Sequence, residues 1–301
     1  MSDEFRFLAG DATRVGRTAP LPHVERVAFL LRDGRSISAL RFEPQDPPRV
    51  VALHGAGLNA HSFDPFILAL DVPALSIDLA GHGRSDWRED ADYRPDHLAD
   101  DIVQVLDRAV PQPVVLVGHS LGGLTAALVA AAIPELVSRL VTVDITPGIS
   151  PRRDAGGVAE FITGQRSYGS IEEIVERAVQ FGIGSDRQAL TRGASLNTRV
   201  RPDGRFEWTH HFAHLDALPT GGSDDPQPYA PIWASLQSLE IPITLVRAAN
   251  GILDDALVAD WHERLPRSVV RSINGSHNLH ESAPVELAET VSSVLPNTGA
   301  I

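Results

Sequence analysis

The sequence contains no cysteine, which excludes disulfide bonds, thiolate catalysis and sulfur-ligated metal sites together. No run approaches the roughly 18 consecutive apolar residues of a membrane helix, and the start, Met1–Glu4, lacks the basic-then-apolar pattern of a signal peptide. Basic residues are few: 26 Lys and Arg against 39 Asp and Glu give a formal net charge of −13, which repels phosphate backbones and anionic membranes. We therefore expect a cytoplasmic protein that acts on a small neutral organic molecule, with no nucleic-acid or membrane partner. A homo-oligomer is compatible with these properties.

What the sequence does contain is ample apolar material, 43% of 301 residues, for a buried core. Short β-rich runs alternate with helical periodicity, which is typical of an α/β fold with a mostly parallel sheet flanked by helices. The first two strands are predicted to form an antiparallel hairpin, and the later ones to be parallel: Val24–Leu31, Ser36–Phe42, Val50–Leu53, Ala74–Leu79, Val114–Val117, Leu140–Ile145, Ile241–Ala248 and Ser268–Ile273. A closing helix begins at Pro284, and only the two ends of the chain look loose.

An insertion follows the strand that ends near Ile145. About 95 residues separate that strand from the next, whereas a parallel crossover needs only about a dozen. The insertion contains one clear amphipathic helix, over Ile171–Val179, and a cluster of aromatic residues that includes Trp208 and Phe212. We predict an α/β core over 1–146 and 239–301 and a helical cap over 147–238 that roofs a substrate pocket.

The most informative motif is Gly118-His119-Ser120-Leu121-Gly122. It directly follows the apolar run Val114–Val117 and opens an Ala-rich helical stretch, Leu121–Ala132. A glycine on each side of a serine at a strand-to-helix junction permits a tight, strained turn that lifts the hydroxyl above the edge of the sheet. This context favours Ser120 as a nucleophile over a solvated serine in an ordinary Gly-rich turn.

Two further motifs precede the serine in the chain. His54-Gly55-Ala56-Gly57 follows one strand, and Asp78-Leu79-Ala80-Gly81-His82-Gly83-Arg84-Ser85 follows the next. With the serine motif, they make the chain resemble the α/β-hydrolase family from roughly Val24 to Leu295. The resemblance implies an α/β-hydrolase fold with a cap, no metal or organic cofactor, and hydrolysis through an acyl-enzyme. Within the second motif, Asp78 and His82 are expected to be loop architecture rather than chemistry.

The roles of the remaining residues follow from the chemistry that a serine needs. An imidazole must accept the hydroxyl proton, and Gly275-Ser276-His277 looks like the family's histidine loop, so His277 is the predicted base and His280 the alternative. The oxyanion is expected to meet the backbone N–H groups of Ala56 and Leu121. The three histidines of His210-His211-x-x-His214 are read as pocket or surface residues rather than metal ligands, because they lack carboxylates in zincin order.

The third member of the triad departs from the commonest pattern. Relatives usually place an aspartate shortly after the strand that corresponds to Ile243–Val246, but 247–253 contains no carboxylate. Asp144, at the end of the preceding parallel strand, is the favoured acid, as in some family members. The alternatives, Asp254 and Asp255, stand directly before a helical pattern, where they would cap the helix.

The predicted activity is cleavage of an ester, lactone or related acyl bond in a small, largely apolar molecule. One alternative is a carbon–carbon bond hydrolase of the meta-cleavage type, which would need cationic groups in the cap pocket, for which Arg166, Arg192 and Arg199 are available. The other is a non-catalytic ligand-binding protein of the same fold, favoured only by the displaced acid.

Overall fold

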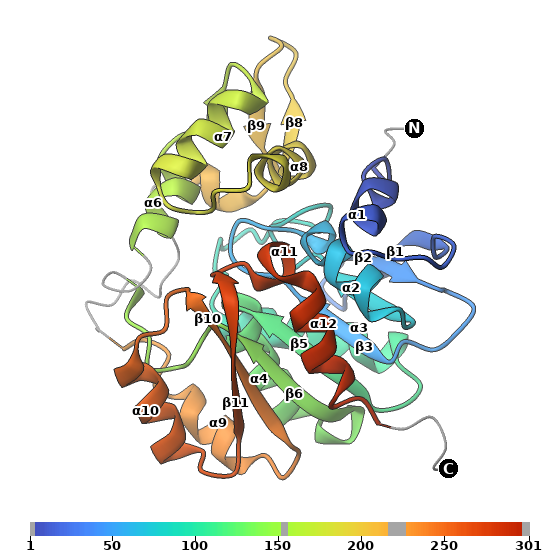
Figure 1. Ribbon diagram of the computed structural model, residues 1–301, viewed down its shortest axis with the longest axis vertical. Helices are drawn as coiled ribbons and strands as arrows, with labels where there is room; N and C mark the ends of the chain where they lie inside the picture. The colour runs from blue at the N-terminus through green and yellow to red at the C-terminus, as the bar shows by residue number, and fades with distance from the viewer. Residues whose placement is uncertain (1–3, 152–155, 216–226, 297–301) are drawn as a thin grey trace.

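The computed structural model describes residues 4–151, 156–215 and 227–296, and its core is an eight-stranded sheet (Figure 1). The strand order is β1-β2-β4-β3-β5-β6-β10-β11, and β2 is antiparallel to both of its neighbours while all other pairs are parallel. The strands are β1 Val24–Leu30, β2 Ser36–Phe42, β3 Val50–Leu53, β4 Ala74–Ile77, β5 Val114–His119, β6 Val137–Val143, β10 Ile243–Asn250 and β11 Val269–Ser276. The predicted hairpin and mostly parallel sheet are confirmed.

Helices cover both faces of this sheet (Figure 1). One face packs against α1 Leu8–Arg14, α2 Asp64–Leu70, α11 Leu279–Ser282 and α12 Pro284–Ser292, and the other against α3 Pro95–Ala109, α4 Leu121–Ala132, α9 Ile232–Ser238 and α10 Asp255–Arg264. Successive strand residues point to opposite faces: in β5, Val114 and Leu116 belong to one buried cluster and Val115 and Val117 to the other. None of the helices in the described ranges is long and apolar enough to cross a bilayer.

The insertion lies over the carboxyl ends of the parallel strands (Figure 1). It contains α6 Gly156–Thr163, α7 Ile171–Gln180 and α8 Arg187–Asn197, together with a three-stranded antiparallel sheet in the order β7-β9-β8 and the 3₁₀ turn η3 His211–His214. The strands are β7 Ser167–Tyr168, β8 Thr198–Val200 and β9 Phe206–Trp208. The prediction of a helical cap did not include this sheet, whose strands are only two or three residues long and leave little periodic signal.

The end of the predicted cap, at 238, includes a helix that packs with the core. Helix α9 contacts α4, its Ile232 and Leu236 are buried in the same cluster as the core strands, and Trp233 lies 5.7 Å from Trp261 between ring centroids. Helix α9, which leads back to β10, therefore belongs to the α/β core and not to the part of the insertion that lies above the strand ends.

From residue 4 onward the N-terminal segment packs on the core, although the sequence suggested a loose end. Helix α1 buries Leu8 and Ala12, and its Asp11 accepts a hydrogen bond from Arg192 Nε of the insertion at 2.7 Å. The guanidinium of Arg192, 5% exposed, also donates from Nη2 to Asp64 Oδ2 at 2.9 Å. A buried arginine of α8 is thus held between α1 and α2, which ties the insertion to the core.

Candidate active site

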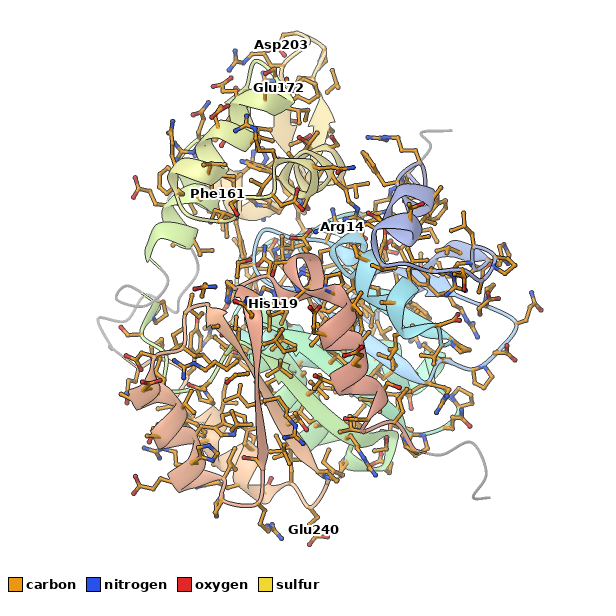
Figure 2. The ribbon with its side chains drawn as sticks, in the orientation of Figure 1. Arg14, His119, Phe161, Glu172, Asp203 and Glu240 are labelled. Atoms are coloured by element: carbon orange, nitrogen blue, oxygen red, sulfur yellow. The ribbon has the colours of Figure 1, made fainter. Side chains whose placement is uncertain are left out.

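Ser120 occupies a tight turn between β5 and α4. Its φ of 51° and ψ of −122° are sparsely populated for any residue other than glycine, so the turn is strained. The carbonyl of Ser120 accepts hydrogen bonds from the N–H groups of Gly123 and Leu124, which begin the helix. Ser120 lines a cavity of about 270 Å³ below the insertion, and the preceding His119 lies at this end of the core in Figure 2.

His277 follows β11 directly and lines the same cavity. Its Nδ1 lies 2.7 Å from Oδ2 of Asp144, which comes directly after β6 and is fully buried. Because the carboxylate can only accept, Nδ1 carries the proton, and Nε2 of the neutral ring is left as an acceptor. The structure therefore pairs Asp144 with His277 and places His277 and Ser120 in the wall of one cavity, at the carboxyl ends of the parallel strands β6, β11 and β5.

The Asp144 carboxylate is held by the last part of β10 and by the loop that follows this strand. Its Oδ1 accepts from Ala248 N and its Oδ2 from Ile252 N, each at 2.9 Å. A Cβ atom at Gly251 would lie 2.0 Å from Asp144 Oδ2, so this position has no room for any side chain. The end of β10 and the loop after it therefore surround an acid that comes from the end of the neighbouring strand, β6.

The two alternative aspartates have other partners. Asp254 is the N-cap of α10 and accepts from Leu257 N at 2.8 Å, while Asp255 pairs with Arg247 at 2.6 Å and is exposed. Both contacts match the capping and surface roles that the sequence offered as the alternative to catalysis. The carboxylate that lies against His277 is that of Asp144.

Ala56 and Gly57 are the central residues of a turn that lines the cavity. Leu58 N donates to Gly55 O at 3.2 Å across the turn, and the φ of +74° at Gly57 is what a type II turn needs at its third position. On the opposite side of Ser120, Leu121 is the first residue of α4, so its N–H has no carbonyl four residues back within the helix. These are the two backbone donors that the sequence predicted for an oxyanion.

The other histidines of the core have structural partners or are sealed from the cavity. His280 stacks on Phe63 at 4.5 Å and is fully buried, and burial holds its pKa well below the usual value. His119 Nε2 donates to His277 O at 3.1 Å, so the residue before the serine also fixes the histidine loop. Sequence reasoning placed His119 in the turn but gave no sign of this bond, which joins residues 158 positions apart.

The histidines of the insertion do not converge on one point. His210 Nδ1 accepts from Ala213 N at 3.2 Å, and His211 Nδ1 lies 2.7 Å from Tyr93 Oη. Among the described residues, no group of three or more metal-ligating side chains could hold an ion. Of the three, His210 lines a second cavity beneath the insertion, and His211 stacks on Trp87 with ring centroids 4.1 Å apart.

A larger cavity of about 690 Å³ adjoins the one at Ser120, and the two share Gly57, Phe161, Ile162 and Asn278. Figure 2 shows Phe161 on the side of the insertion that faces the core. The apolar lining of the larger cavity comes mainly from the insertion. Besides Phe161 and Ile162, the apolar lining residues of the insertion are Ile174, Ala178, Val179, Ile183, Ala189, Leu190, Ala194 and Trp208.

Three of the residues considered at the sequence level lie outside the two cavities. Phe212, expected in the pocket roof, packs instead against His82, with ring centroids 4.8 Å apart. Arg192 is held by Asp11 and Asp64, as described above, and Arg199 pairs with Glu207 at 2.7 Å. Neither arginine is among the described residues that line the two cavities.

Comparison with known proteins identifies the family to which this fold belongs. A family model described as the alpha/beta hydrolase fold matches residues 48–284. The chain belongs to the α/β-hydrolase family. Among curated hydrolases, it is 36% identical to the esterase Rv0045c of Mycobacterium tuberculosis over 97% of this chain and 96% of the relative. It is 26% identical to the lipase LipV of the same organism, over 85% of this chain and 96% of that protein.

Solved structures of hydrolases place the same fold over nearly the whole chain. A structure of the M. tuberculosis esterase Rv0045c superposes with a TM-score of 0.84, covering 97% of this chain and 98% of that one. E-2-(acetamidomethylene)succinate hydrolase, at 21% identity and a TM-score of 0.78, covers 90% of this chain and 98% of its own and shows the fold alone.

Proposed function

We propose that this hydrolase is a serine esterase in which Ser120 is the nucleophile, His277 the general base and Asp144 the orienting acid. The observation that carries the proposal is the 2.7 Å contact between His277 Nδ1 and Asp144 Oδ2, beside a cavity that both His277 and Ser120 line. This contact fixes the imidazole in the tautomer whose Nε2 can take a proton. A relative that bears the name esterase, similar over nearly its whole length, supports the same reaction class.

The reaction follows from these positions. His277 Nε2 takes the proton as Ser120 Oγ attacks the ester carbonyl carbon, and the negative oxygen is met by the N–H groups of Ala56 and Leu121. The tetrahedral intermediate collapses, the carbon–oxygen bond to the alcohol breaks, and the imidazolium returns the proton to that alcohol. Water then attacks the acyl-enzyme through the same steps and releases the acid. Asp144 keeps the ring oriented and stabilises its positive charge throughout.

The cavities favour a small, largely apolar ester. The larger one offers mostly aliphatic and aromatic side chains of α6, α7 and α8. Arg14 is the one arginine among the described lining residues, which include no lysine. It is paired with Asp186 at 3.1 Å, and the carboxyl of Glu281 is also in the wall. A free substrate carboxylate would find little positive charge there, which counts against the carbon–carbon hydrolase alternative.

A fluorophosphonate probe tests the proposal directly. We expect one adduct by intact mass, mapped to Ser120, and no adduct in Ser120→Ala. The same variant should hydrolyse p-nitrophenyl esters of increasing acyl length, and lactones, at least about 10³-fold more slowly than the wild type. Unlabelled wild-type protein would indicate the ligand-binding alternative, and an adduct on another residue would refute the assignment of the nucleophile.

A further inference from the structure

A fully buried histidine holds the turn that carries Ala56. Gly57 N donates to His82 Nε2 at 3.1 Å, and Gly57 stands next to Ala56 in the turn. Apart from this bond, the turn is closed by Leu58 N donating to Gly55 O at 3.2 Å. His82 belongs to the second motif, which the proposed mechanism leaves without a role.

The ring of His82 is fixed in one protonation state. Its Nδ1 lies 3.0 Å from Ala80 O and donates to it, so Nε2 is free to accept from Gly57 N. Burial, with the neighbouring His54 second, lowers the pKa of His82 to about 3. A charged ring would present a donor to Gly57 N, so the bond requires the neutral form.

The insertion supplies one wall of the space around this ring. Phe212 of η3 meets His82 edge to face at 4.8 Å, with the planes at 80°. The same turn is docked on the core by His211 N, which donates to Gly81 O at 2.7 Å, and by stacking of His211 on Trp87 at 4.1 Å. Phe212 therefore contributes to the dry surroundings of His82, and not to the pocket roof.

We infer that His82 is a positioning residue for ester hydrolysis, which holds the Ala56–Gly57 peptide so that the Ala56 N–H meets the oxyanion, and that Phe212 seals it. The inference rests on the proposed function. Displacement of an active-site group by about 1 Å can cost about 10²-fold in rate, and removal of one oxyanion donor costs about 10²–10³-fold. Loss of the bond from Gly57 N should therefore lower kcat/KM by about 10- to 100-fold, through kcat rather than KM.

The test compares His82→Leu, which removes the acceptor, with His82→Gln, whose longer side chain can return an oxygen to the position of Nε2. The measurements are kcat and KM for p-nitrophenyl acetate and the inhibition constant of a trifluoromethyl ketone, whose hemiketal oxygen binds the oxyanion donors. Titration with fluorophosphonate gives the active fraction. We expect the inhibition constant to rise in His82→Leu by the same factor as kcat/KM falls, KM to stay within about threefold, and His82→Gln to recover about 10-fold.

Tyr93→Phe is the matched control. It removes a hydroxyl that contacts Arg88 N and His211 Nδ1 at the same junction, and it leaves the bond from Gly57 N to His82 intact. It should change kcat/KM by less than about threefold. An unchanged inhibition constant in folded His82→Leu, or no recovery in His82→Gln, overturns the inference. If His82→Leu does not fold, the comparison is His82→Gln with the shorter His82→Asn, and equal inhibition constants overturn it. Wild-type enzyme without labelling at Ser120 would instead overturn the proposed function.

Discussion

The substitution Asp144→Asn probes the proposed triad at its least expected member. The carboxylate accepts three hydrogen bonds, from His277 Nδ1, Ala248 N and Ile252 N. An asparagine side chain offers one oxygen and one NH₂ group at this place. If the NH₂ group faces His277, it opposes two donors, Nδ1–H and Ile252 N–H. If it faces Ala248, that backbone N–H is left without an acceptor.

Both orientations have a measurable consequence. With the NH₂ group toward His277, the ring is driven to carry its proton on Nε2, and the serine loses its base. The corresponding change in other triads lowers kcat by about 10⁴-fold. At least one buried backbone N–H group, that of Ile252 or that of Ala248, is left unpaired in either orientation, which costs about 1–3 kcal/mol. The two backbone donors to Asp144 are the reason to expect this loss of stability.

The assay pairs ester hydrolysis with thermal and urea unfolding of the same preparations. Asp144→Asn should fall in kcat by about 10³–10⁴-fold and lose about 1–3 kcal/mol of unfolding free energy. Asp254→Asn retains a good N-cap residue, so its unfolding free energy should change by no more than a few tenths of a kcal/mol. Its kcat should be that of the wild type. Asp144→Asn with activity within tenfold of wild type, or Asp254→Asn with a loss as large as that of Asp144→Asn, would refute the reasoning.

Three further perturbations have defined outcomes. His280→Leu should keep activity within about threefold and leave the unfolding free energy unchanged or higher, because both ring nitrogens of His280 are buried without a partner among the described residues. A large loss of acylation in this variant would show that His280, and not His277, is the base. Trp208→Ala should raise KM about 10-fold for long acyl esters and not for acetate, since its ring lines the larger cavity; an equal loss on both esters would contradict that placement. Burial opposes the charge on His61, but Asp64 and Glu4 outweigh it and raise the pKa of His61 from 6.5 to about 9. The charged His61 therefore stabilises the fold by about 3 kcal/mol at most, fully below pH 6.5 and no longer once the pH has risen through 9. The unfolding free energy measured in urea should decline across this pH range in the wild type and not in His61→Gln.

The sequence predicted the central sheet well because its parallel strands are buried on both faces. Strand β3 was placed to the residue, as was β2 of the hairpin, because glycine, proline or charged residues bound these apolar runs. The predicted ends of β5 and β11 fall before the observed ones, because these strands continue past their apolar runs to the polar residues His119 and Ser276 beside the cavities. Local periodicity carries no information on such an extension.

The candidate site divides in a similar way. Ser120, His277 and Ala56 lie in short motifs with fixed local geometry, so their neighbourhood could be predicted from the residues. The partner of His277 could not be settled by spacing, because Asp144 lies 133 residues away and meets it only through strand pairing. The same holds for α1 and for Phe212, whose positions depend on contacts between the insertion and the core that leave no periodic pattern.

The buried position of Arg192 has a consequence for protein engineering. Exchange of the insertion between family members is an attractive way to alter which esters are cleaved. A foreign insertion without an arginine at this point would leave Asp64 paired with His61 alone and the buried carboxylate of Asp11 without its paired arginine, and an unpaired buried charge typically costs several kcal/mol. A transplant would have to carry helix α1 with it, or replace Asp11, so the portable unit in this hydrolase is discontinuous in the chain.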